Sequence, residues 1–129
     1  MRTSECDGST RAGRLAKARQ FASSAVDVLA LADDEAAVSD VFVTLAVTAG
    51  IAAADVICCA RLGVHARGES HDDAVALLKQ ADTDAAASLR VLLSLKTHAA
   101  YSSASVSVTA LCRAQRAMLK LVALAGALA

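Results

Sequence analysis

Lys96 and Tyr101 are the first residues in this chain whose types and spacing suggest chemistry. They share one end of a predicted helix, with His98 beside them. A lysine can hold a phosphate, and a lone tyrosine can stack on a base, so the group could form a cleft for a nucleotide. The alternative is structural: Lys96 or Tyr101 pairs with Asp55, a carboxylate inside an apolar stretch that needs a partner if it is buried.

A second group is basic and comes from both ends of the chain. Its members are Arg11, Arg14 and Lys17 near the start, and Arg113, Arg116 and Lys120 near the end. Phosphate contacts from such side chains give affinity without sequence preference. We therefore expect either one phosphate-binding face or a solvated basic surface.

The charge distribution supports both interpretations. Residues 1–26 carry five basic and two acidic side chains, a net +3; residues 27–84 carry three and eleven, a net −8; residues 85–129 carry five and none, a net +5. Basic ends that pack together would attract an anionic ligand or an acidic protein partner. Basic ends that meet the acidic middle would leave no such face.

The sequence contains no pattern typical of a metal or cofactor site. There is no Gly-rich phosphate loop, metal-ligand cluster, paired-carboxylate site or serine triad. The four cysteines, Cys6, Cys58, Cys59 and Cys112, lack the spacing of a zinc site. We predict no metal and no cofactor, and we expect the cysteines to serve as small apolar residues.

The elements that must position these side chains are helices. Hydrophobic residues make up 56% of the chain and aromatics 2%; alanine dominates, and there is no proline. Such a composition favours long, uninterrupted helices. Apolar periodicity and capping residues predict a disordered tail over residues 1–9, then one domain over residues 10–129, with helices over residues 10–32, 35–62, 85–101 and 108–128 and a further helix opening after Ser70. The predicted fold is an all-α, four- to five-helix up-down bundle.

The segment 35–62 is the predicted central helix, because it is apolar on most sides. Ala46, Ala49, Gly50 and Ala53 place small side chains on one of its faces. Small residues let another helix approach closely. That helix could belong to the same bundle or to a second copy, and we expect a homodimer through this face.

The predicted location is cytoplasmic, with no membrane contact. The longest uncharged apolar stretch, residues 41–54, is shorter than the roughly 20 residues that span a bilayer. The first residues show no apolar signal core.

Three segments, residues 52–57, 71–78 and 95–102, together with the helical order, resemble a HEPN domain. The resemblance covers about residues 11–125. It implies a bundle of four or five helices that usually dimerises and often binds RNA or nucleotides. Active members of that family are metal-independent ribonucleases, often toxins paired with an antitoxin. Their signature is an arginine that steadies the phosphate, separated by four to six residues from a histidine that moves protons.

The chain departs from that signature. Arg67 and His71 have three residues between them, and Arg90 and His98 have seven. We therefore expect a HEPN-like module that binds RNA or nucleotides without cleaving them, within a toxin–antitoxin or defence-type system. The alternatives are a ribonuclease that uses Arg67 with His71 or Arg90 with His98, a protein-binding adaptor, or a DNA-binding protein.

Overall fold

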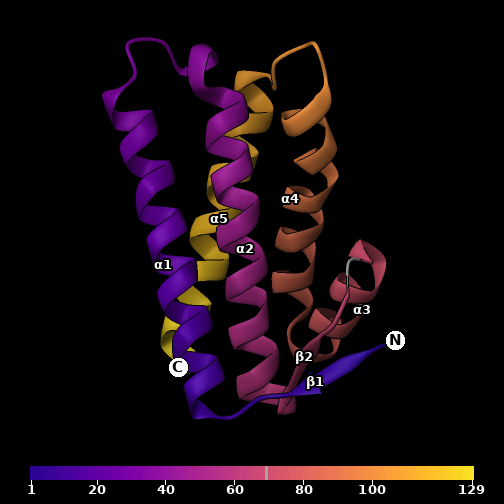
Figure 1. The fold of residues 1–129 in the computed structure, drawn as a ribbon. Coiled ribbons are helices and arrows are strands. Elements are labelled where there is room, and N and C mark those ends of the chain that lie inside the picture. Colours follow the sequence, from indigo (N-terminus) through magenta and orange to yellow (C-terminus); the bar gives the residue numbers. More distant parts are fainter. Residues whose placement is uncertain (69) are drawn as a thin grey trace.

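The computed structural model describes residues 1–68 and 70–129. Its helices are α1 (Gly8–Leu31), α2 (Ser39–Leu62), α3 (His71–Ala81), α4 (Thr83–Tyr101) and α5 (Val108–Leu128), and a 3-10 turn, η1 (Glu35–Val38), leads into α2. The long helices α1, α2, α4 and α5 alternate in direction, with α5 behind α2 and the short α3 beside α4 (Figure 1). The predicted all-α up-down bundle is confirmed.

Side-chain caps explain where the helices begin. The Asp7 carboxylate accepts the Thr10 N–H at 2.8 Å, which starts α1 at Gly8 and lowers the pKa of Asp7. The predicted Ser70 cap of α3 is confirmed, since its hydroxyl accepts an N–H bond from the first turn. Asp82 ends α3 and caps α4, so one residue turns the chain between two helices.

The centre of the bundle is α2, which packs against α1, α4 and α5. Its small residues are inside this packing. A Cβ at Gly50 would overlap the side chain of Leu92 on α4 and lie 3.4 Å from that of Leu121 on α5. The small-residue face is therefore used within the bundle, and the expected dimer through that face is wrong. Dimerisation by another surface stays a prediction.

The segment Glu35–Leu62 is, within the described residues, a helix long and apolar enough to cross a membrane. However, 67% of its most apolar window is buried inside the bundle. The core helix of a bundle can be as long and as apolar as a membrane span, and the packing of α2 against its neighbours accounts for its composition in this way.

The first residues do not form the expected disordered tail. Residues Thr3–Glu5 form β1, which pairs antiparallel with β2 (Val64–Ala66) directly after α2. Gly63 ends α2 in the left-handed conformation, with φ of 75°, and so allows the sharp turn into β2. The paired residues lie 59 or more positions apart in the sequence, so local sequence patterns do not predict this sheet.

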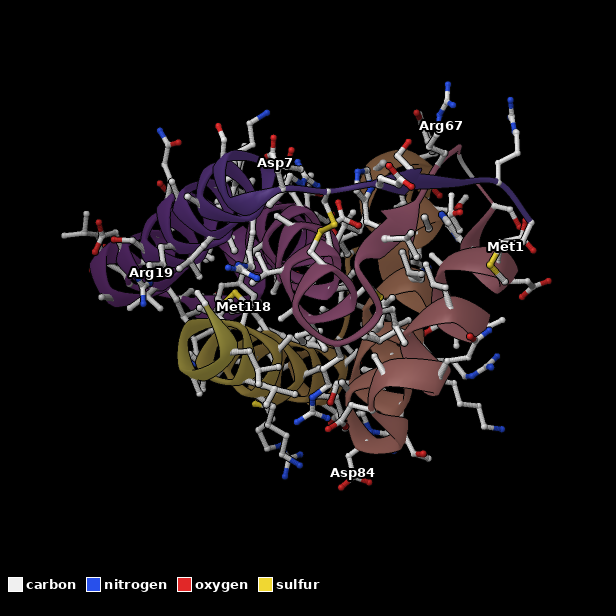
Figure 2. The ribbon with its side chains drawn as sticks, turned by 90° about the horizontal axis from the view of Figure 1, so that it is seen from below. Met1, Asp7, Arg19, Arg67, Asp84 and Met118 are labelled. Carbon is white, nitrogen blue, oxygen red and sulfur yellow. A yellow bond between two sulfur atoms is a disulfide. The ribbon has the colours of Figure 1, made fainter. Side chains whose placement is uncertain are left out.

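A disulfide joins Cys6 to Cys59, with their Cα atoms 5.8 Å apart (Figure 2). The expectation that all four cysteines are small apolar residues is thus wrong for this pair; Cys58 is buried and free, and Cys112 is exposed and free. The bond ties the start of α1 to the end of α2. Disulfides are rare in the reducing cytoplasm, and the cytoplasmic location stays a prediction.

Candidate functional site

The exposed face of α2 forms the floor of a groove between α1 and α4. We call this the α2 groove; its volume is about 580 Å³. Its apolar residues are Phe21 from α1, Val47, Ile51 and Ala52 from α2, and Ala100 from α4. The size lies in the range of about 300–1,000 Å³ typical of small-molecule sites, and the apolar floor suits the flat face of an aromatic ligand.

The rim of the α2 groove is basic. Arg14 and Lys17 line it from α1, Lys96 from α4, and His71 from the first turn of α3. The described residues that line the groove include no acidic side chain, although Asp55 lies just beyond them and pairs with Arg14. The structure thus brings Lys17 together with Lys96, which lies 79 positions away in the sequence, and the positive charges of the rim favour an anionic ligand.

Tyr101 stands at the end of this rim, on the last turn of α4. Its side chain is 85% exposed. The loop after it is held to the start of α2, because the Asp40 carboxylate accepts the Val106 N–H at 2.9 Å. The bond ties the loop between α4 and α5 to the start of α2. The largely exposed Tyr101 lines the same groove as Lys96.

Two threonines that the sequence analysis missed also line the groove. The hydroxyl of Thr44 donates to the Asp40 carbonyl at 2.8 Å, and that of Thr48 donates to the Thr44 carbonyl at 3.1 Å. Because both protons are used by the helix backbone, the oxygens remain as acceptors. The signal that could have found them is polar residues four apart on an otherwise apolar helix.

Asp55 closes one end of the groove through an ion pair with Arg14. The Arg14 Nη2 lies 2.8 Å from Asp55 Oδ2, and Nε donates to the same oxygen at 2.9 Å. The Nδ1 of His65 lies 4.0 Å from the other carboxylate oxygen. The interpretation that Lys96 or Tyr101 partners Asp55 is therefore wrong, and much of the positive charge of Arg14 is neutralised inside the fold.

Burial governs the ionisation of this cluster. Desolvation raises the pKa of Asp55, while the charges of Arg14 and His65 act in the opposite direction. The neighbouring Cys58 has its pKa raised to about 12, by burial first and by Asp55 second. That thiol is a poor nucleophile at neutral pH. The cluster is a structural element at the end of the groove.

The arginine and histidine candidates pair differently from the sequence-based expectation. His71 and Arg90 line one hollow of about 230 Å³ between the start of α3 and α4. His98 lies eight residues beyond Arg90, about 12 Å along the same helix, so the structure does not bring these two together. Arg67 is held at the sheet by its N–H bond to the Arg2 carbonyl at 2.9 Å and points away from the bundle (Figure 2).

The predicted basic face is divided between two sides of the molecule. Arg113, Arg116 and Lys120 line a separate, shallow hollow of about 650 Å³ that we call the α4–α5 groove. Asp84, at the edge opposite Arg67 in Figure 2, lies at its α4 side. The basic ends of the chain therefore do not form a single face, because α2 and α4 separate Lys17 from these residues.

No protein-family model, curated protein or solved structure matches this chain. The HEPN resemblance therefore stays a prediction. Among the described residues, no three His, Cys, Asp or Glu side chains are grouped as a metal site requires.

Proposed function

We propose that the protein binds a nucleotide, free or as a unit of RNA, in the α2 groove and does not cleave it. The observation that supports this most directly is the combination of rim and floor. Lys17 and Lys96 lie on opposite sides of an apolar floor, and the exposed ring of Tyr101 stands at the end. The groove therefore offers cations for the phosphate, an apolar surface for the base and an aromatic ring on which the base can stack.

In this mode of binding, Lys17 and Lys96 hold the phosphate by charge-assisted hydrogen bonds. The base lies against the apolar floor and stacks on Tyr101. The Thr44 and Thr48 oxygens accept hydrogen bonds from its amino group or from the ribose. Arg14 has a lesser role, since Asp55 already engages its guanidinium.

Tyr101 makes the proposal directly measurable. The chain has no tryptophan and no other tyrosine, so its fluorescence comes from one side chain on the rim of the groove. We expect uridine or adenosine monophosphate to quench this fluorescence saturably, after correction with free N-acetyltyrosinamide. Uridine, which lacks the phosphate, should bind more weakly.

Charge variants locate the site. Lys17→Gln or Lys96→Gln should each raise the Kd for the monophosphate about tenfold, because each removes a charged hydrogen bond. Arg67→Gln, the same loss of charge away from the groove, is the matched control and should leave the Kd unchanged. Equal Kd values in all three variants would rule out the α2 groove as the binding site.

A ribonuclease is the second candidate, favoured by the shared hollow of His71 and Arg90. In this reaction Arg90 steadies the phosphate and His71 moves the proton. Cleavage of a labelled RNA should then disappear in His71→Ala and in Arg90→Ala but persist in His98→Ala and Arg67→Ala. Cleavage that is absent from the wild type, or unaffected by the first two variants, would exclude it.

The wider setting follows from the HEPN resemblance and is part of the same proposal. A nucleotide- or RNA-binding bundle, acting as a homodimer, would suit a toxin–antitoxin or defence-type system. A protein-binding adaptor with an acidic partner predicts no response of Tyr101 to nucleotides. A DNA-binding protein predicts that duplex DNA binds better than RNA.

A further inference from the structure

Three other hollows lie beside the α2 groove around α4, and each hollow shares lining residues with the next. His71 lines both the α2 groove and the small hollow that contains Arg90. Val75 and Arg90 line that hollow and a next one of about 180 Å³, also between α3 and α4. Ala87 lines this third hollow and the α4–α5 groove. The shared residues place the four hollows one after another around α4, which contacts α2, α3 and α5, and we call this series the track (Figure 1).

Each of the four hollows is lined by at least one lysine or arginine. After Lys17 and Lys96 in the α2 groove come Arg90 and Lys79 between α3 and α4, and then the three cations of the α4–α5 groove, Arg113, Arg116 and Lys120. Within the described residues, none of these seven makes an ion pair; among the basic residues that line the α2 groove, Arg14 does, with Asp55. Asp72 and Asp84 are the acidic residues along the four hollows. A mononucleotide would leave most of these charges without a partner.

We propose that the track binds a single phosphodiester strand, with one nucleotide in the α2 groove and the following phosphates on the cations around α4. The inference rests on the proposed function of the α2 groove and extends it from a nucleotide to a strand. A duplex does not fit, because its persistence length of about 150 base pairs prevents it from turning around one helix. An acidic polypeptide would match the charges but would not use the Tyr101 ring or the apolar floor.

The length of the strand is the first test. Oligouridylates of about 2 and about 15 nucleotides, with oligodeoxythymidylates of the same lengths, are titrated by fluorescence anisotropy at low salt. The longer strand should bind at least tenfold more tightly, with the gain levelling off within the range of about 4–16 nucleotides that single-strand sites occupy. Ribose and deoxyribose strands that behave alike would assign the affinity to phosphates, whereas tighter RNA binding would assign part of it to the 2′-hydroxyl.

A matched pair of triple variants gives the second test. The distal variant is Arg113→Gln, Arg116→Gln and Lys120→Gln. The control is Arg2→Gln, Arg19→Gln and Arg67→Gln, which removes the same charge from exposed residues that line none of the four hollows. The distal variant should lose about tenfold or more in affinity for the long strand, and its slope of log K against log salt should be less steep by about 2. The control should match the wild type.

The outcomes separate this inference from the proposed function. If uridine monophosphate still quenches Tyr101 but the distal variant binds the long strand like the control, the track is wrong and the α2 groove stands. If Lys17→Gln and Lys96→Gln do not affect the monophosphate while the distal variant loses the strand, the proposed function is wrong. If polyglutamate competes as effectively as an oligonucleotide, the proposed binding of a phosphodiester strand is wrong and the track binds an acidic protein instead.

Discussion

Arg14 and Asp55 join α1 to α2 at the end of the α2 groove, with Nη2 2.8 Å from Oδ2. Their side chains are 28% and 16% exposed, so the pair is largely shielded from water. Asp55 lies four residues before Cys59, whose disulfide to Cys6 holds the start of α1 over the same end of α2. One ion pair and one disulfide therefore fix the position of Lys17, one turn further along α1 from Arg14.

The ionisation of Asp55 predicts how stability depends on pH. Burial raises its folded pKa above the ordinary 3.8, against the opposing charges of Arg14 and His65. The native state therefore binds the Asp55 proton more tightly than the unfolded chain does. This contribution to the free energy of unfolding is fully present below pH 3.8 and is lost as the pH rises through the folded pKa.

Asp55→Asn, which resembles the protonated acid and cannot titrate, isolates this effect. We expect the free energy of unfolding of the wild type, relative to this variant, to fall as the pH rises from below 3.8 through the raised folded pKa of Asp55, by about 1.4 kcal/mol per unit of pKa shift. Urea unfolding followed by circular dichroism measures it. A difference that instead grows with pH would mean that Arg14 and His65 outweigh burial.

The cysteines should react with iodoacetamide in a fixed order. In the native, unreduced protein only Cys112 should be alkylated, because Cys58 is buried with a pKa raised to about 12 and the other two are joined. Urea without reductant should add Cys58, and reduction should add Cys6 and Cys59. Mass spectrometry of the intact chain counts the groups, and Cys112→Ser is the control for the native label. Four groups in urea without reductant would show that the disulfide is absent.

Gly50→Ala should destabilise the protein because the new methyl group meets Leu92 of α4. Overpacking of this kind costs about 1–3 kcal/mol. Gly13→Ala is the matched control: it lies within α1 with open space around it, so the better helix propensity of alanine should stabilise by about 0.5–1 kcal/mol. Thermal unfolding followed by circular dichroism should show the two variants shifting in opposite directions. A neutral Gly50→Ala would mean that α2 and α4 are less closely packed than described.

The sequence predicted some of the residues that line the α2 groove and not others. Lys17, Lys96 and Tyr101 were predicted because a cation or a lone aromatic on a helix is visible in the chain itself, and the structure places all three along the groove. Thr44 and Thr48 were not predicted: their spacing of four residues on an apolar helix marks a shared face, but local sequence does not say which helices border that face. Arg14 was predicted to bind a ligand, whereas in the structure its guanidinium pairs with the carboxylate of Asp55, which lies 41 positions away.

The sequence by itself determined the helices, because helix formation depends on contacts within a few residues. The apolar periodicity of α1 and α5, the Ser70 cap and the Gly63 stop all operate at that range. Only the tertiary structure decided which helices touch. Alanine-rich faces are alike and can pack in several ways, so it took the Gly50 contact with Leu92, the pairing of β1 with β2 and the Cys6–Cys59 bond to select one arrangement. That arrangement places the basic residues in two separate grooves, one over α2 and one between α4 and α5.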